Sequence, residues 1–206
     1  MLFRSGIVIK ENEWKRDKST LSTKIAALGY PVFVKPARGG SSRGTSKVKS
    51  DTELEQAMQA AFSFDSKVMV EVAIVGSEIE CAVLEIDGKV RASIPGKVSI
   101  DPKYEFYDFE AKYLDGATDI IVPAPVDKEI LEKVQHAAIA AFQALGCSGL
   151  ARVDFFVTHD GEIIINELNT MPGFTTTSVF PKMWAASGIN FTEVITHLLE
   201  TALTRT

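Results

Sequence analysis

The stretch LARVDFFVTHDGEIIINELNTMPGF, residues 150–174, contains two apolar runs separated by a short turn at residues 159–161. An Asp-Gly pair between two such runs is a strong signal for a β-hairpin. Side chains alternate across a strand, so polar residues two positions apart share one face. Each run carries one such pair, and the four residues are Arg152, Asp154, Glu167 and Asn169.

Two interpretations of this polar hairpin are open. Carboxylates that cluster on paired strands are costly to bury unless a partner neutralises them. A hard divalent cation that bridges a phosphate is such a partner, because it prefers oxygen ligands. A hairpin with one solvated face explains the same spacing, and the residues by themselves do not separate the two.

The composition indicates a globular protein without an obvious polyanionic partner. At 206 residues with 46% hydrophobic residues, the chain is long enough for one good core or two small ones. The net charge of -5 gives no electrostatic reason to expect nucleic acid or an anionic membrane as a partner, and no apolar run approaches the length of a membrane span. Cys81 and Cys147 lie in apolar surroundings without CxxC spacing, which favours reduced thiols in a cytoplasmic protein.

Strand-like runs interrupted by helices, with several hairpins, indicate an α+β chain of two lobes that meet near residues 73 and 74. We expect domains at residues 1–73 and 74–206, and a solvated loop at residues 15–18. Strands are expected at residues 7–10, 32–34, 68–74, 78–86, 90–94, 120–122 and in the hairpin. Helices are expected at residues 20–28, after Ser50, at 127–145, near 181–187 and after Asn190.

Three helices carry more detailed predictions. Ser50 and Glu53 match a capping box at the start of one helix. The apolar face of the helix at residues 127–145 is expected to extend to Leu145. The last helix is expected to point four residues inward, namely Val194, Ile195, Leu198 and Leu199.

Lys35 follows a buried-looking strand and precedes ARGGSSRGTS, residues 37–46, which holds three glycines and three serines. A fixed cation beside free backbone amides is a phosphate-binding combination. The order is not that of a Walker loop, in which the lysine follows the glycines. An ordinary turn is one interpretation of this segment, and a mobile lid is the other.

Glu71 is embedded in the apolar run VMVEVAI, residues 68–74. A lone carboxylate at a junction of lobes requires a donor such as the exocyclic amine of a purine, and the backbone up to Ile74 could add hydrogen bonds. Glu71 and Glu78 also fit solvated carboxylates at strand ends. All three histidines are expected to be solvated or satisfied and not catalytic, and they are His136, His159 and His197.

Five segments in this order, VFVKPARGGSSRG, VEVAIVGSEIE, FYDFEAKY, ARVDFF and NELNTMPGFTTTSVFPKMW, closely resemble the central and C-terminal parts of D-alanine-D-alanine ligases of the ATP-grasp superfamily. The resemblance runs from about Thr20 to the end. It implies an ATP-grasp fold with nucleotide bound between two lobes with antiparallel-rich sheets, residues 1–73 being the lid-bearing central subdomain and 74–206 the C-terminal one. It also implies ATP- and magnesium-dependent ligation of two D-alanines through an acyl phosphate, for peptidoglycan precursor synthesis.

The resemblance assigns a role to each matching residue. Lys35 and Lys112 would contact ATP phosphates, Glu71 the adenine, Glu78 the ribose, and Phe106 the base. The remaining ATP-binding positions would be Ser42, Ile74, Phe156 and Asn166. Two magnesium ions, with manganese as a substitute, would be held by Asp154, Glu167 and Asn169. Arg152, Ser41, Tyr113 and Gly173 would take part in catalysis, and Ser178 would hold the carboxylate of the second D-alanine.

One departure concerns the start of the chain. Family members carry an N-terminal domain and a further ATP-contacting lysine before the point where this sequence begins, so we expect a fragment with weak or no dipeptide synthesis alone. Arg43 is a second departure, since an apolar residue is more usual there. The alternatives are a non-catalytic ATP-binding module and another ATP-grasp carboxylate-amine ligase. The expected partners are ATP and D-alanine, with a homodimer left open.

Overall fold

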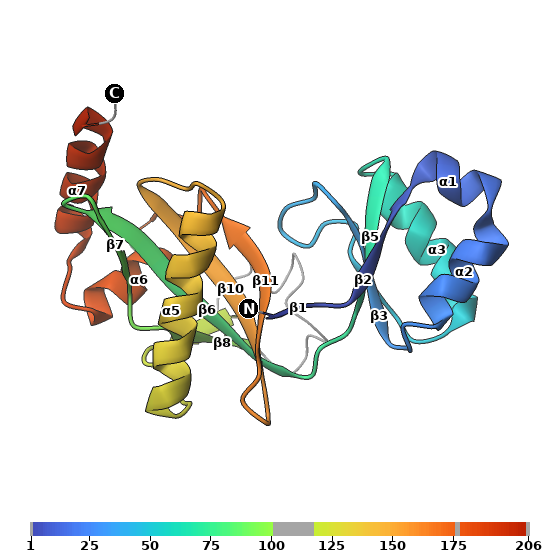
Figure 1. Ribbon diagram of the computed structural model, residues 1–206, viewed down its shortest axis with the longest axis horizontal. Coiled ribbons are helices and arrows are strands. Elements are labelled where there is room, and N and C mark those ends of the chain that lie inside the picture. Colours follow the sequence, from blue (N-terminus) through green and yellow to red (C-terminus); the bar gives the residue numbers. More distant parts are fainter. Residues whose placement is uncertain (1, 101–117, 176–177, 205–206) are drawn as a thin grey trace. The chain divides into compact units, whose positions relative to one another are not determined.

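The computed structural model describes residues 2–100, 118–175 and 178–204. Among these described residues, Arg4–Ile74 lies in one compact unit, and those of 2–3, 75–99 and 119–204 form the other. The chain therefore passes from one unit to the other between Ile74 and Val75. Each unit has its own sheet and its own core (Figure 1).

The Arg4–Ile74 unit is a four-stranded antiparallel sheet covered on one face by three helices (Figure 1). Its strand order is β2-β5-β3-β4. The apolar residues of the strands alternate, and the inward set, including Ile9, Val34 and Val70, packs with Ile25 and Met58 of the helices. The elements are β2 (Gly6–Lys10), α1 (Glu11–Arg16), α2 (Lys18–Ala26), β3 (Val32–Pro36), β4 (Ser46–Val48), α3 (Asp51–Phe62) and β5 (Lys67–Val72).

Two local predictions for this unit are wrong. The first is the solvated loop expected at residues 15–18, which is instead mostly helical. Residues 15 and 16 end helix α1 and Lys18 begins α2, because the buried Trp14 packs this segment against the core. The capping box also does not form. Ser50 makes no side-chain cap and its hydroxyl contacts that of Thr52, whereas the Glu53 carboxylate accepts from the Lys49 backbone N–H.

The second unit is built on a seven-stranded sheet of order β1-β11-β10-β6-β8-β9, with β7 paired to β6. All of its pairings with a described register are antiparallel except that of β1 with β11. Its elements are β1 (Leu2–Phe3), β6 (Gly76–Ile86), β7 (Lys89–Ala92), β8 (Gly96–Ile100), β9 (Thr118–Ile121), α5 (Lys128–Ala144), β10 (Leu150–Thr158), β11 (Ile163–Asn169), α6 (Val179–Ala186) and α7 (Phe191–Thr204).

The two faces of this sheet are covered differently. Helix α5 packs on one face against a core that includes Cys81, Val153 and Phe155 (Figure 1). Helices α6 and α7 pack on the other face, but only against the end of β6 that carries Ala82, Leu84 and Ile86. The part of that face around residues 78–80 carries polar side chains instead.

The expected hairpin at residues 150–174 is confirmed by β10 and β11. Its register contains an irregularity, because Asp154 pairs with Glu167 whereas Phe155 pairs with Ile165. Asn166 is therefore an extra residue on β11, as in a β-bulge. The bulge places Glu167 and Asn169 directly opposite Asp154 and Arg152.

Three apolar residues that were expected on the buried faces of the long helices are not buried. Leu145 follows the end of α5 and is exposed, and Ile195 and Leu199 on α7 are exposed as well. Val194 and Leu198 do pack against the core. Among the described residues, no helix combines the length and apolar character needed to cross a bilayer.

Candidate active site

A row of polar side chains crosses three strands of the seven-stranded sheet. Asp154 lies opposite Glu167 on one side and Glu80 on the other, and Phe156 lies opposite Glu78. Directly opposed residues of antiparallel strands point to the same face. Alternation along β10 adds Arg152 to that face, with Asn169 opposite it.

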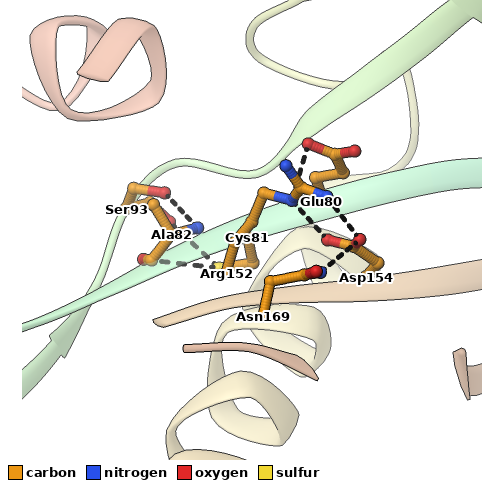
Figure 2. A network of polar contacts seen from close by, with 7 residues as sticks. All are labelled: Glu80, Cys81, Ala82, Ser93, Arg152, Asp154 and Asn169. Carbon is orange, nitrogen blue, oxygen red and sulfur yellow. Dashed lines mark hydrogen bonds and ion pairs between the residues drawn. The ribbon is translucent and has the colours of Figure 1, made fainter. Parts of the chain in front are cut away.

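Arg152 is the centre of this row (Figure 2). Its Nε and Nη2 donate to the two carboxylate oxygens of Asp154, both at 2.7 Å, and Nε lies 3.1 Å from Glu80 Oε2. The Asn169 amide donates to Asp154 Oδ2 at 2.9 Å. Bidentate contacts between a guanidinium and a carboxylate fix the plane of both groups, so Arg152 and Asp154 are held in defined orientations.

Glu80 was not among the residues predicted from the sequence. Its side chain is 4% exposed and forms the second ion pair of Arg152. The signal was present in GSEIECAVL, residues 76–84, where Glu78 and Glu80 alternate with Ile79 and Cys81. The same alternation that placed Glu78 on the polar face places Glu80 there.

The donor set on this face fits a hard divalent cation. Asp154, Glu167 and Asn169 offer only oxygen ligands, which magnesium prefers. Asp154 Oδ2 accepts from both Arg152 and Asn169, whereas Oδ1 accepts from Arg152 Nε. Glu80 and Asp154 both face the single guanidinium of Arg152, so this part of the sheet gathers carboxylates around one positive charge.

Beneath this face, Cys81 points into the core and contacts carbonyl oxygens of Ala82 and Ser93 (Figure 2). Burial raises the pKa of the Cys81 thiol to about 12. Cys147 is a free thiol as well. A thiol with so high a pKa is protonated at neutral pH, so Cys81 is a packing residue and not a nucleophile.

The Arg4–Ile74 unit holds a second polar group. Lys35 Nζ lies 2.7 Å from Glu71 Oε2, and Arg4 Nη2 lies 3.3 Å from the same oxygen. Phe33 lies opposite Glu71 in the register, so Lys35, two residues further along β3, is on the same face. The pairing of Lys35 with Glu71, and the part played by Arg4, were not foreseen from the sequence.

The glycine-serine loop folds back on Phe64. Ser41, Ser42 and Gly44 have φ of 54°, 56° and 72°, and a Cβ on Gly44 would lie 2.5 Å from a ring carbon of Phe64. A larger residue at position 44 would therefore adopt a strained φ and displace the Phe64 ring. Arg43 places its guanidinium 5.6 Å from the centre of the same ring, a cation-π distance. This contact gives the unusual arginine a local partner.

The base of the loop is held by Asp65. Its carboxylate accepts from the backbone N–H of Arg38 at 2.9 Å and of Lys67 at 3.0 Å, and from the Arg38 guanidinium at 2.6 and 3.0 Å. The hydrogen bonds from the Arg38 side chain, more than any other cause, hold the pKa of Asp65 well below its usual range. Asp65 therefore stays ionised and ties the start of the loop to the beginning of β5.

The remaining predicted residues are distributed as follows. Gly173 and Ser178 are close, since a Cβ on Gly173 would lie 3.2 Å from Ser178 Oγ. That hydroxyl also accepts from the Thr175 backbone N–H at 2.9 Å. Ile74 ends the first unit, after β5. Phe106, Lys112 and Tyr113 lie outside the described residues.

The chain is similar over most of its length to known ligases. Residues 5–200 match the family described as "D-ala D-ala ligase C-terminus". The D-alanine--D-alanine ligase of Arthrobacter sp. (strain FB24) is 50% identical over 203 residues, covering 97% of this chain and 53% of the relative. That of Mycobacterium avium (strain 104) is 53% identical over 194 residues, covering 91% and 52%. The chain thus spans about half the length of the curated relatives that it matches.

Solved structures of ligases are also similar to this chain. The VanG D-Ala:D-Ser ligase from Enterococcus faecalis has a TM-score of 0.85 at 37% identity, covering 98% of this chain and 57% of that one. The D-alanine-D-alanine ligase from Coxiella burnetii has a TM-score of 0.82 at 33% identity, covering 98% and 52%. The expected α+β, ATP-grasp fold is confirmed by these neighbours and by the antiparallel sheets. The chain belongs to the D-alanine-D-alanine ligase family, through the portion that the C-terminal family model describes.

Proposed function

We propose that this chain serves the ATP- and magnesium-dependent ligation of two D-alanines through an acyl phosphate, a step of peptidoglycan precursor synthesis. The observation that carries the proposal is the Arg152 guanidinium, held by Glu80 and Asp154 on the face that also presents Glu167 and Asn169. Family membership supports it, because relatives with about half of their residues identical are named D-alanine--D-alanine ligases.

Asp154, Glu167 and Asn169 would hold the divalent cations, two magnesium ions for which manganese substitutes. The cations supply charge neutralisation of the ATP phosphates, which lowers the barrier to phosphoryl transfer. Asp154 has a second task in this proposal, since its two hydrogen bonds to Arg152 fix the guanidinium. Arg152 would then stabilise the acyl phosphate and the tetrahedral intermediate.

Lys35 and Glu71 would bind the nucleotide from the other unit. Both described ion pairs of Glu71 go to Oε2, which leaves Oε1 to accept from the exocyclic amine of adenine. Lys35, held at 2.7 Å, would offer its remaining N–H groups to phosphate oxygens. Glu78 would bind the ribose hydroxyls, and Ser42, Ile74, Phe106, Lys112, Phe156 and Asn166 would complete the nucleotide contacts.

The proposed chemistry follows from these proposed roles. The carboxylate of the first D-alanine attacks the γ-phosphorus of ATP while Lys35 and Arg152 offset the negative charge. The amine of the second D-alanine then attacks the acyl phosphate, and the backbone near Gly173 with Arg152 stabilises the oxyanion. Ser178 holds the carboxylate of the second D-alanine, Tyr113 helps to order that site, and the loop with Ser41 excludes water.

Phosphate release and dipeptide formation, followed with ATP, Mg²⁺ and D-alanine, test the proposal. Because the chain spans about half the length of its relatives, we expect only weak D-alanine-stimulated phosphate release and a small amount of dipeptide by mass spectrometry, with both lost in Arg152→Met. Replacing half of the D-alanine by D-serine tests the second-site preference, since a D-Ala:D-Ser ligase is among the structural neighbours. Tight binding of Mg-ATP without any turnover would contradict ligation and favour a non-catalytic nucleotide-binding module.

A further inference from the structure

Three side chains with metal-binding atoms meet at the C-terminal helix, away from the row around Arg152. They are Asp87 in the turn between β6 and β7, and His197 and Glu200 on α7. One ligand atom from each lies within 4.8 Å of the other two. All three residues belong to the same unit, so their relative placement is defined.

The turn that carries Asp87 has little conformational freedom. Asp87 and Gly88 have φ of 52° and 69°, and Ile86 pairs with Lys89 directly across them. Two consecutive residues with positive φ between paired strands form the tight hairpin turn that matches the twist of a β-ribbon. The Asp87 carboxylate is therefore presented from a fixed backbone.

Helix α7 is also held in place against β6. Val194 and Leu198 pack into the core beside Leu84 and Ile86, and the Thr201 hydroxyl donates to the Glu85 carbonyl at 3.2 Å. His197 and Glu200 are three residues apart, so they lie on one face of the helix. Both sides of the cluster are thus anchored before any ligand binds, which lowers the entropic cost of binding.

The His197 ring has an unmet requirement. Its Nδ1 is buried and has no hydrogen-bond partner in the described part of the chain, and the nearest carboxylate oxygen, Glu200 Oε2, lies 3.5 Å away. The expectation that His197 is solvated or satisfied is therefore wrong for this nitrogen. A buried nitrogen without a partner is costly, and a metal ion that accepts its lone pair removes that cost.

We propose that Asp87, His197 and Glu200 form a zinc site that joins helix α7 to the β6–β7 turn. One imidazole nitrogen and two carboxylates suit zinc, which binds nitrogen and oxygen at about 2.0–2.2 Å with tetrahedral geometry. Ligand atoms around such an ion lie about 3.4 Å apart, so the two exposed carboxylates need only small side-chain rotations to close on it. Water fills the fourth position. Magnesium is disfavoured here, because it prefers oxygen ligands.

Calorimetric titration of the 206-residue chain with ZnCl₂, in saturating Mg²⁺ to occupy the oxygen-only face, tests the site. We expect one zinc ion per chain. His197→Ala removes binding, and Asp87→Asn weakens it by at least about tenfold, because each removes one of three ligands. His136→Ala is the matched control, since His136 is exposed on α5 and outside the cluster, and it binds zinc as the unchanged chain does.

Thermal unfolding gives a second readout. At the same zinc concentration, the midpoint temperature should rise equally in the unchanged chain and His136→Ala, and by less in Asp87→Asn. Asparagine tolerates positive φ, so Asp87→Asn keeps the turn and decides the question even if His197→Ala folds poorly. Equal zinc affinity in the unchanged chain and Asp87→Asn, or no zinc binding by the unchanged chain, overturns the proposal.

Discussion

The Lys35 ammonium lies 2.7 Å from Glu71 Oε2, so the cation at the end of β3 and the carboxylate of β5 form one ion pair. Arg4 approaches the same oxygen at 3.3 Å, and the Glu71 and Arg4 side chains are only 10% and 6% exposed. One carboxylate therefore serves two cations in a largely desolvated place, and its removal leaves both without this charge partner.

Glu71→Gln should destabilise the protein by roughly 3 kcal/mol, because breaking a buried ion pair leaves a charge without compensation. Urea unfolding measures the change, and calorimetry should find weaker ATP binding. Glu55→Gln is the control, since Glu55 pairs with Lys18 at 2.6 Å but both side chains are substantially exposed. Its effect should stay below about 1 kcal/mol. Equal losses in the two variants would contradict the central role of Glu71.

Glu80→Gln should lower D-alanine-stimulated phosphate release by at least about tenfold, because Arg152 then loses the ion pair that helps to fix its guanidinium. The KM for ATP should change little, since Glu80 acts through Arg152 and not on the nucleotide. Steady-state kinetics separate the two quantities. Glu162→Gln, in the exposed β10–β11 turn, should leave both unchanged. A rise in KM with constant kcat would refute the positioning role.

Asp154→Ala and Glu167→Ala should each weaken magnesium-dependent ATP binding, because both carboxylates are proposed metal ligands. His136→Ala should not. The two variants should differ in stability, since Asp154 is hydrogen-bonded to Arg152 and Asn169 whereas Glu167 is exposed. Calorimetry with and without Mg²⁺, together with urea unfolding, distinguishes a lost ligand from a disturbed fold. Identical binding in all three variants would exclude the metal assignment.

Asp65 should give the protein a pH-dependent share of its stability. Its pKa is lowered in the folded state, chiefly by hydrogen bonds from the Arg38 side chain, so the unfolded chain binds the proton more readily. The stability that Asp65 contributes is complete above the pKa of about 3.9 that its carboxyl has in the unfolded chain. It is lost as the pH falls through the lower pKa of the folded state. Urea unfolding from pH 6 down to acid should therefore show a steeper loss of stability for the unchanged chain than for Asp65→Asn. Glu129→Gln is the control, because it alters an exposed ion pair between Glu129 and Lys133 on α5. Its stability should fall with pH as steeply as that of the unchanged chain.

Gly76→Ala should destabilise the second unit by about 1–3 kcal/mol. A Cβ at this position would lie 2.5 Å from the Val157 carbonyl oxygen, where β6 and β10 pair. Gly40→Ala is the control, because a Cβ there meets nothing within 4 Å and its φ is not positive. It should leave stability unchanged or raise it by about 0.5 kcal/mol. Chemical denaturation that ranks the two variants equally would argue against the close approach at Gly76.

In the hairpin of β10 and β11, side-chain alternation predicted the faces within each strand but not the register between the strands. Alternation within each strand correctly placed Arg152 with Asp154, and Glu167 with Asn169. It could not decide whether the two pairs share a face, because that depends on the register between the strands. The extra residue Asn166 sets that register. Without the bulge, Asp154 would lie opposite Asn166, and Glu167 would point to the α5 side of the sheet.

The sequence by itself determined the antiparallel α+β architecture, the polar face of β10 and the resemblance to the ligase family, because these depend on local periodicity and on short ordered motifs. Only the tertiary structure decided which charges are partners, namely Arg152 with Glu80 and Glu71 with both Lys35 and Arg4, and that Asp87 lies near His197. These residues are far apart along the chain or belong to different elements. Their distances are set by strand register and helix packing, which no local pattern encodes.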